Sequence, residues 1–183
     1  MNLPVQTIPA LPSPEDIILA DGSHAVIRPI QSEDAKHLKA TFLRLSSQSI
    51  YFRFMAHKKE LTDEEAQHLA NVDYRTHMAF VALIEEDGKP VIVGVSRYAL
   101  FDLSKPDMAE SAVVVRDDCQ HRGIGRLLLW RLVDYARLQG VRYLRGIILP
   151  ENLRMVELIK KGGLPFEKRF VDGYFQITID IGS

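Results

Sequence analysis

Apolar residues along the chain follow two different spacings, and their alternation predicts a mixed α/β domain. Short runs rich in β-branched residues, bounded by turn residues, predict strands, and longer segments with apolar residues three and four apart predict helices. The ranges predicted as strands are 17–20, 24–30, 78–84, 91–100, 109–115, 141–149, 166–170 and 174–181. The ranges predicted as helices are 33–45, 46–55, 62–71, 124–139 and 151–161.

The predicted order of elements favours a mostly antiparallel sheet flanked by helices. Asp-Gly pairs at 21–22, 87–88 and 172–173 predict three hairpin turns. Helices and strands do not alternate regularly, which argues against a doubly wound sheet. Strand 109–115 is apolar and small apart from Glu110, so we expect it to be buried on both faces.

Prolines and helix-capping residues predict where elements begin in the first part of the chain. The first fourteen residues hold four prolines and no periodicity, so we expect 1–16 to form a Pro-rich tail and 17–183 a single domain. Ser32 is the expected cap of the first helix, and Thr62 opens a capping box with Glu65.

The segment between strand 109–115 and helix 124–139 has the composition of an anion-binding turn. Gly123 and Gly125 let the backbone approach a ligand, and the helix that follows offers unpaired N–H groups and the positive end of its dipole. Such an arrangement usually binds phosphate. The sequence lacks the Gly-Lys-Ser/Thr of a Walker loop, and Leu128 stands where a dinucleotide fingerprint has its third glycine. A plain strand-to-helix turn is the alternative.

The run from Gln120 to Gly125 reads Q-x-x-G-x-G after a strand and resembles the pyrophosphate loop of the GNAT superfamily of acyl-CoA-dependent N-acetyltransferases. The order of elements is also similar to the GNAT fold, a mostly antiparallel sheet splayed between its fourth and fifth strands. The resemblance implies acetyl-CoA as co-substrate, with its diphosphate on the loop and its pantetheine arm along the strand. The residues expected to bind it are Val113, Val114, Val115, Gln120, His121, Arg122, Gly123, Ile124, Gly125, Arg126 and Asn152.

Glu110 is the expected general base of this reaction. It is the one acidic residue in its strand, where a carboxylate is costly unless it borders a cleft, and we expect it to be partly buried. A solvated strand-end carboxylate, or one paired with an arginine such as Arg97, is the alternative. Many relatives protonate the leaving thiolate with a tyrosine in the last helix, but Ile159 occupies that position here, so no general acid is assigned.

Four stretches, 27–30, 46–54, 93–98 and 110–129, resemble the acetyltransferase domain of bacterial protein-lysine acetyltransferases that modify acyl-CoA synthetases. The resemblance implies a protein lysine as acceptor, such as one on an acyl-CoA synthetase. An acetyltransferase for small amines and a non-catalytic acyl-CoA-binding sensor are the alternatives. The acceptor surface is expected from the early helices and the last hairpin.

Composition narrows the class of partners. A net charge of −1 gives no reason to expect nucleic acid or a membrane as partner. The single cysteine, Cys119, excludes an internal disulfide framework and fits a reducing compartment, where we expect it to be an incidental thiol. Since no signal peptide or membrane-spanning run is recognised, we expect a cytoplasmic protein, as a monomer or homodimer. The histidines lack metal-ligand spacing, so no metal is expected.

Overall fold

A computed structural model of the chain describes residues 10–182. One sheet has its strands in the order β1-β2-β3-β4-β5-β6-β8-β7, and every neighbouring pair is antiparallel except β5–β6. The strands are β1 (Glu15–Ile18), β2 (His24–Pro29), β3 (His77–Glu86), β4 (Lys89–Leu100), β5 (Met108–Val115), β6 (Tyr143–Ile148), β7 (Phe166–Val171) and β8 (Tyr174–Asp180). The helices are α1 (Ala35–Phe42), α2 (Ser47–Phe54), α3 (Asp63–Ala70), α4 (Ile124–Leu138) and α5 (Leu153–Gly162), with single 3-10 turns at Ser32–Asp34 and Asp117–Cys119. The predicted fold class is confirmed.

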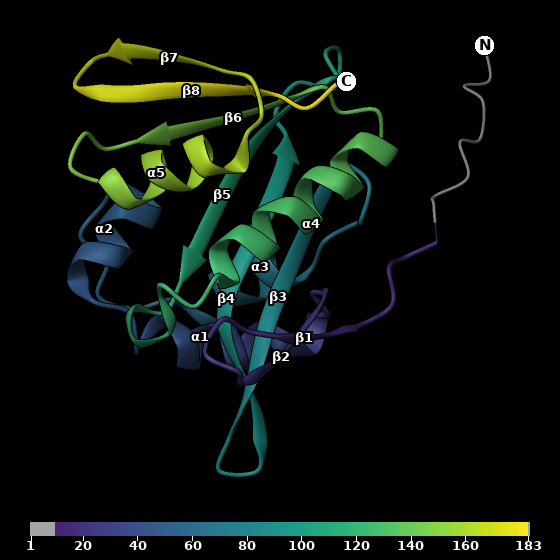
Figure 1. Cartoon of the computed structure of the whole chain (residues 1–183), viewed down its shortest axis with the longest axis vertical. Helices are drawn as coiled ribbons and strands as arrows, with labels where there is room; N and C mark the ends of the chain where they lie inside the picture. Colours follow the sequence, from purple (N-terminus) through teal and green to yellow (C-terminus); the bar gives the residue numbers. More distant parts are fainter. Residues whose placement is uncertain (1–9, 183) are drawn as a thin grey trace.

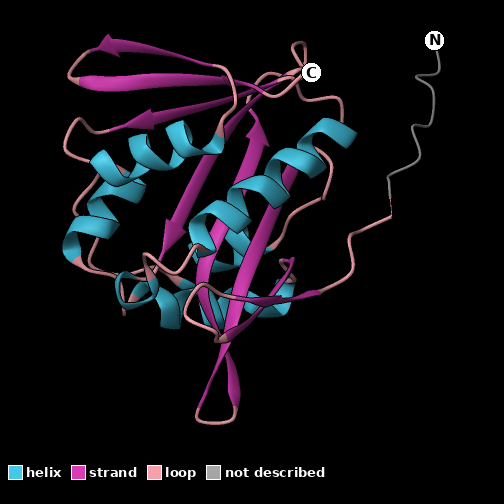
Figure 2. Cartoon of the chain, in the orientation of Figure 1, coloured by secondary structure: helices cyan, strands magenta, loops and turns pink. Residues whose placement is uncertain are grey.

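Helices cover both faces of the sheet (Figures 1 and 2). A separate cluster of buried apolar residues lies under each layer of helices. On one face, α4 and α5 pack against the central strands through residues such as Leu128, Leu132 and Ile159. On the other face, α1, α2 and α3 pack through residues such as Phe42 and Ile50. The apolar stripes that predict these helices are therefore the stripes that bury them.

Local sequence signals place most element ends correctly. Asp87 and Asp172 adopt positive φ with the glycines that follow them, as two-residue hairpin turns require. The capping box of Thr62 and Glu65 is present in the structure. The expected cap at Ser32 is wrong, because a 3-10 turn begins there and the Asp34 carboxylate accepts the Gln31 N–H at 2.8 Å.

Two expectations about burial and boundaries are corrected. Strand β1 begins at Glu15, so the boundary expected after residue 16 falls inside the strand, while residues 1–9 of the expected tail lie outside the described residues. Strand β5 is not buried on both faces: Ala109 is buried, Glu110 is exposed and residues 111–115 are half-buried. The reason is that β5 borders a cleft.

Among residues 10–182, no helix is long and apolar enough to cross a bilayer. Over the same residues, no group of three or more His, Cys, Asp or Glu side chains is arranged to hold a metal ion.

Candidate active site

The cleft arises because β5 and β6 diverge after a short parallel contact. Their pairing covers only Met108–Glu110 against Tyr143–Arg145, whereas β6 pairs with β8 on its other side over its whole length, from Tyr143 to Ile148. The expected position of the splay, between the fourth and fifth strands, is wrong, because β4 and β5 pair from Gly94 to Leu100 and the sheet opens between β5 and β6. The opening has a volume of about 910 Å³, which is in the range of small-molecule and cofactor sites. Its walls come from α2, β5, the turn before α4, β6 and α5.

The edge of β5 that faces the cleft carries unpaired backbone groups. The Arg116 N–H donates to the Val93 carbonyl at 2.8 Å, which sets the alternation of the β4–β5 ladder. By that alternation the backbone groups of Val114 turn toward β4, and those of Val113 and Val115 turn toward the cleft. Of the three valines expected to bind a pantetheine arm, Val113 therefore offers both backbone groups to it and Val115 its N–H, since the Val115 carbonyl accepts from the Gln120 side chain. Val114 contributes only its side chain.

The turn before α4 presents a row of unpaired donors. Gly123 has a φ of 89° and His121 a φ of 64°, and this left-handed path bends the chain into the helix. In the described part of the chain, no acceptor is found for the backbone N–H groups of residues 121–126. A Cβ on Gly123 would meet nothing within 4 Å, so the space beside it is open. The donors that the sequence predicts for a diphosphate are thus present and free.

The two arginines of this turn have different roles. The Arg122 guanidinium donates to the Asp21 carboxylate at 2.6 Å and to the Ser23 hydroxyl, which ties the turn to the first hairpin. Hydrogen bonds from Ser23, with a smaller contribution from Arg122, lower the pKa of Asp21 to about 2. Arg126 is exposed at the cleft and has no ion pair with any described residue. Arg126 is therefore the free cation of the loop.

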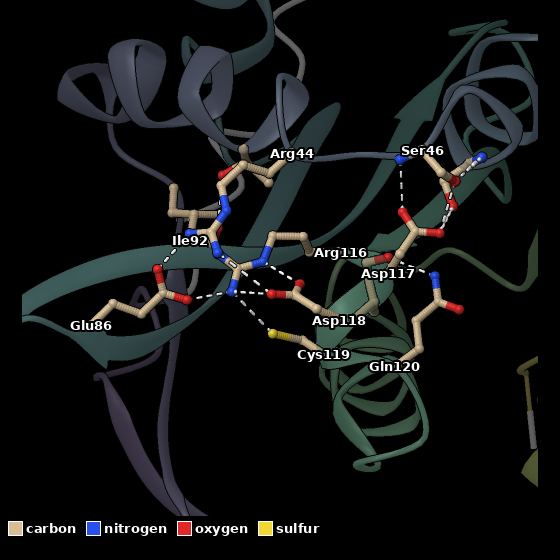
Figure 3. Close-up of polar contacts among 12 residues, drawn as sticks. Arg44, Ser46, Glu86, Ile92, Arg116, Asp117, Asp118, Cys119 and Gln120 are labelled. Atoms are coloured by element: carbon tan, nitrogen blue, oxygen red, sulfur yellow. Dashed lines mark hydrogen bonds and ion pairs between the residues drawn. The ribbon is translucent and has the colours of Figure 1, made fainter.

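A buried arginine anchors the start of the turn (Figure 3). Arg116 is 1% exposed, and its guanidinium binds Glu86 and also Asp118, from Nε at 2.5 Å and from Nη2 at 3.0 Å. Burial alone would lower the pKa of Arg116, but the bonds to the two carboxylates outweigh it and raise the pKa. Arg44 joins the group from the end of α1 through Glu86 and Asp118. The sequence pattern gives no signal for this cluster, because its members are distant along the chain.

A second set of bonds joins the same turn to α2. Asp117 accepts the Ser46 N–H at 2.9 Å and the hydroxyls of Ser46 and Ser49 at 2.8 Å, as Figure 3 shows for Ser46. Burial alone would raise the pKa of Asp117, but these bonds outweigh it and lower the pKa. The turn is thus fixed to the first hairpin through Arg122, to β3 through Arg116 and to α2 through Asp117.

The side chains of Gln120 and Asn152 are already engaged. Gln120 donates to the Val115 carbonyl at 3.0 Å and accepts from Arg154 of α5, a residue that sequence reasoning missed. Asn152 is the N-cap of α5, where its side chain accepts the Met155 N–H at 3.2 Å. Both residues line the cleft, so each is placed beside a ligand while it holds local structure.

Glu110 lies toward the other end of β5, where it forms with Arg145 the last pair that β5 makes with β6. Its side chain is 57% exposed and pairs with Arg145 at 3.1 Å, so the expected partial burial is wrong. The arginine that pairs with it is Arg145, which stacks on Phe101 at 4.4 Å, and not Arg97. The reason is the β5–β6 register, which sets Glu110 directly opposite Arg145.

Comparison with known proteins identifies the family. The sequence profile of the Acetyltransferase (GNAT) family matches residues 44–163. The chain belongs to the GNAT acetyltransferase family. It is 37% identical over 140 residues to an acetyltransferase from Pseudomonas aeruginosa, an alignment that covers 76% of this chain and 74% of that protein.

Two further likenesses concern proteins called Pat. The chain is 28% identical over 158 residues to the acetyltransferase Pat of Mycolicibacterium smegmatis, and this match covers 86% of the chain but only 46% of Pat. The crystal structure of the GNAT domain of S. lividans PAT superposes with a TM-score of 0.82 at 27% identity, covering 91% of this chain and 96% of that domain. The resemblance to the acetyltransferase domains of protein-lysine acetyltransferases is therefore supported.

Proposed function

We propose that the chain transfers an acetyl group from acetyl-CoA to the side-chain amine of a protein lysine. The observation that carries the proposal is the alignment of three features along one strand. The free N–H groups of the turn follow the end of β5, the cleft-facing backbone groups of Val113 and the N–H of Val115 lie in its second half, and Glu110 lies near its start. At ~3.3 Å per residue, Glu110 and Val115 are about 16 Å apart, which gives the cleft a diphosphate end and a reacting end.

The residues present fit acetyl-CoA. Backbone N–H groups of 121–126, together with Arg126, would hold the diphosphate, and Val113 would pair with the amides of the arm as a neighbouring strand does. Acetyl-CoA supplies a thioester carbonyl as the electrophile. Gln120 and Asn152 would keep the turn and α5 in place around it.

Glu110 is proposed to take a proton from the acceptor. An ammonium must lose a proton before its nitrogen attacks, and a carboxylate on the exposed side of the cleft meets the acceptor as it arrives. Arg145 holds the carboxylate in position. Ile159 is buried, and its aliphatic side chain has no acidic proton to give to the leaving thiolate. Water is proposed to protonate the thiolate instead.

Membership of an acetyltransferase family supports the reaction, and the likeness to the PAT domain supports lysine as acceptor. A protein such as an acyl-CoA synthetase, in the cytoplasm, is the proposed partner. A non-catalytic acyl-CoA sensor is the second candidate, favoured by the isoleucine at 159 in place of a proton donor.

Calorimetric titration with acetyl-CoA and with CoA tests the cofactor site. We expect a micromolar dissociation constant, equivalent to about −8 kcal/mol. If millimolar ligand gives no heat of binding and does not raise the melting temperature, the Gly-rich turn is only a structural turn and the proposal fails.

A Glu110→Gln variant separates the enzyme from the sensor. We expect acetyl transfer to fall about 10²- to 10⁴-fold while the affinity for acetyl-CoA is unchanged. Glu167→Gln is the matched control, because Glu167 is also an exposed strand carboxylate paired with an arginine, at 3.0 Å, but it lies on β7 outside the cleft lining. Full turnover by Glu110→Gln would show that Glu110 is not the base, and absence of transfer by the wild type to any amine would favour the sensor.

A further inference from the structure

Two arginines on the α2 side of the cleft have no counter-ion. Arg53 belongs to α2 and Arg97 to β4, and both are half-buried and line the cleft. Arg53 lies over the ring of Phe54 at 4.9 Å, and Arg97 donates to the Leu69 carbonyl at 2.8 Å. Within the described residues, no carboxylate lies within ion-pair distance of either guanidinium.

This pair differs from most other arginines of the protein. Those that form ion pairs with carboxylates are Arg28, Arg44, Arg116, Arg122, Arg131, Arg137, Arg142, Arg145 and Arg169. Burial lowers the pKa of Arg97 to about 9, with repulsion from Arg53 as a further cause, and burial also lowers the pKa of Arg53. Two half-buried cations side by side are unfavourable, and an arriving anion would relieve both the desolvation and the repulsion.

The position of the pair points to the acceptor and not to the diphosphate. Arg97 is directly opposite Ala112 in the β4–β5 ladder, and Glu110 is two residues from Ala112 on the same face. The Cβ atoms of Arg97 and Glu110 are therefore diagonal neighbours, about 7 Å apart. Val115, where the turn begins, is three residues from Ala112, or about 10 Å along the strand.

We propose that Arg53 and Arg97 form a carboxylate-binding subsite for the acyl acceptor. The preferred acceptor would then be a primary amine that carries a carboxylate near it. This inference rests on the proposed function. The carboxylate would bind the two guanidinium groups, which suit the planar geometry of that anion, while the amine lies at Glu110. The carboxylate has two possible sources, an acidic residue beside the target lysine or the carboxyl group of a small amino acid.

Matched pairs of acceptors test this preference directly. One arm uses lysine peptides with a single Asp placed at each position from three before to three after the lysine, each paired with its Asn counterpart. The other arm uses 4-aminobutyrate and 6-aminohexanoate, each paired with its amide. We expect at least one anionic member to exceed its neutral partner about tenfold or more in kcat/KM, or about 1.4 kcal/mol. The arm that shows the preference identifies the source of the carboxylate.

An Arg53→Gln variant assigns the preference to this subsite. The Arg53 side chain makes no hydrogen bond to any described side chain or backbone group, so its replacement breaks no hydrogen bond of the fold. We expect the ratio between anionic and neutral acceptors to fall to about one, with unchanged affinity for acetyl-CoA and no decrease in melting temperature. Arg169→Gln, which removes an exposed arginine from β7, is the control and should retain the wild-type ratio.

The outcomes separate this inference from the proposed function. If the wild type binds acetyl-CoA and acetylates amines with equal kcat/KM in every pair, the subsite is refuted and the acetyltransferase stands. A preference that survives in Arg53→Gln and also in Arg97→Gln would likewise refute it. If acetyl-CoA does not bind at all, the proposed function fails first. Reversal of the preference toward neutral or cationic amines in Arg53→Glu would give independent support.

Discussion

The two ends of the cleft are built in opposite ways. At the turn before α4, nearly every charged side chain has a partner: Arg116 with Glu86 and Asp118, Arg122 with Asp21. At the acceptor end, Arg53 and Arg97 have no carboxylate among the described residues, and the exposed Glu110 pairs with the half-buried Arg145. Among the described residues, the fixed end leaves the backbone N–H groups of residues 121–126 and the Arg126 side chain without partners, whereas the acceptor end leaves two guanidinium groups without a carboxylate.

The two ends of the cleft therefore suit two kinds of ligand: a cofactor that is the same in every turnover, and an acceptor that is exchanged. A cofactor that is the same in every turnover is bound best by donors held rigidly in advance, because their ordering costs nothing at the time of binding. An acceptor has to enter, react and leave, and the two guanidinium groups proposed to bind it have no carboxylate partner among the described residues.

The largest expected effect is a loss of stability in the Arg116→Met variant. The change leaves the carboxylates of Glu86 and Asp118 without their buried partner and should lower the free energy of unfolding by about 3 kcal/mol. Urea titration followed by circular dichroism measures it. The control is Arg44→Met, which removes a 46% exposed arginine from the same carboxylates and should cost less than about 1 kcal/mol. Equal losses in the two variants would show that burial of Arg116 does not fix the turn.

The next effect concerns affinity at the diphosphate end. In Gly123→Asp, a carboxylate occupies the open space beside the turn and repels the diphosphate, so acetyl-CoA affinity should fall about tenfold or more, or about 1.4 kcal/mol. Gly140→Asp at the other end of α4 is the matched control, because Gly140 also has positive φ (80°) and also no atom within 4 Å of an added Cβ. Calorimetry should show a strong loss only for Gly123→Asp, and equal losses would reduce the effect to backbone strain.

A smaller effect is expected from Asp21→Asn, which breaks the bond between the first hairpin and Arg122. The pKa of Asp21 is lowered to about 2 in the folded chain, so its contribution to stability is present above about pH 4 and is lost as the pH falls toward 2. Thermal melts across that range should show the wild type slightly more stable than the variant at pH 6 and equal to it near pH 2. Asp16→Asn, an exposed change on β1, should show no such convergence. A difference that persists at pH 2 would contradict the assignment.

The smallest effect is expected at Cys119. Its thiol is buried, and burial raises its pKa, so it should react slowly with a disulfide reagent at pH 7 and rapidly in urea. Cys119→Ala should retain acetyl transfer within about twofold. Loss of turnover in a folded variant would place the thiol in the chemistry.

Local patterns were sufficient for most of the fold. The Asp-Gly turns, the capping box at Thr62 and the apolar stripe of α4 each act over a few residues, so the chain itself encodes them. Predictions failed where a distant element intervened. Strand β5 looks buried in sequence, but its pairing with β6 ends at Glu110 and its second half borders the cleft. A 3-10 turn takes the place of the expected cap at Ser32, and the Asp34 carboxylate of that turn accepts from Arg28 of β2 at 2.7 Å as well as from the Gln31 N–H.

The site divides in the same way. The Gly-rich turn and the family resemblance could be read from Gln120 to Gly125 because the turn is one continuous segment. The bonds from Arg154 to Gln120 and from Ser46 to Asp117, and the choice of Arg145 as partner of Glu110, could not be read, since each depends on strand register or helix packing.

The sequence by itself determined the elements, the turn with free N–H groups and the family, because backbone conformation and apolar periodicity are local properties. Tertiary structure alone decided where the sheet opens, which valine edges face the cleft and which arginines stay unpaired. Those features depend on hydrogen-bond register and on the distance between charges from separate strands and helices, and a linear sequence states neither. The end of the β5–β6 pairing at Glu110 is what turns a predicted loop into one end of a cleft, with Arg53 and Arg97 toward the other.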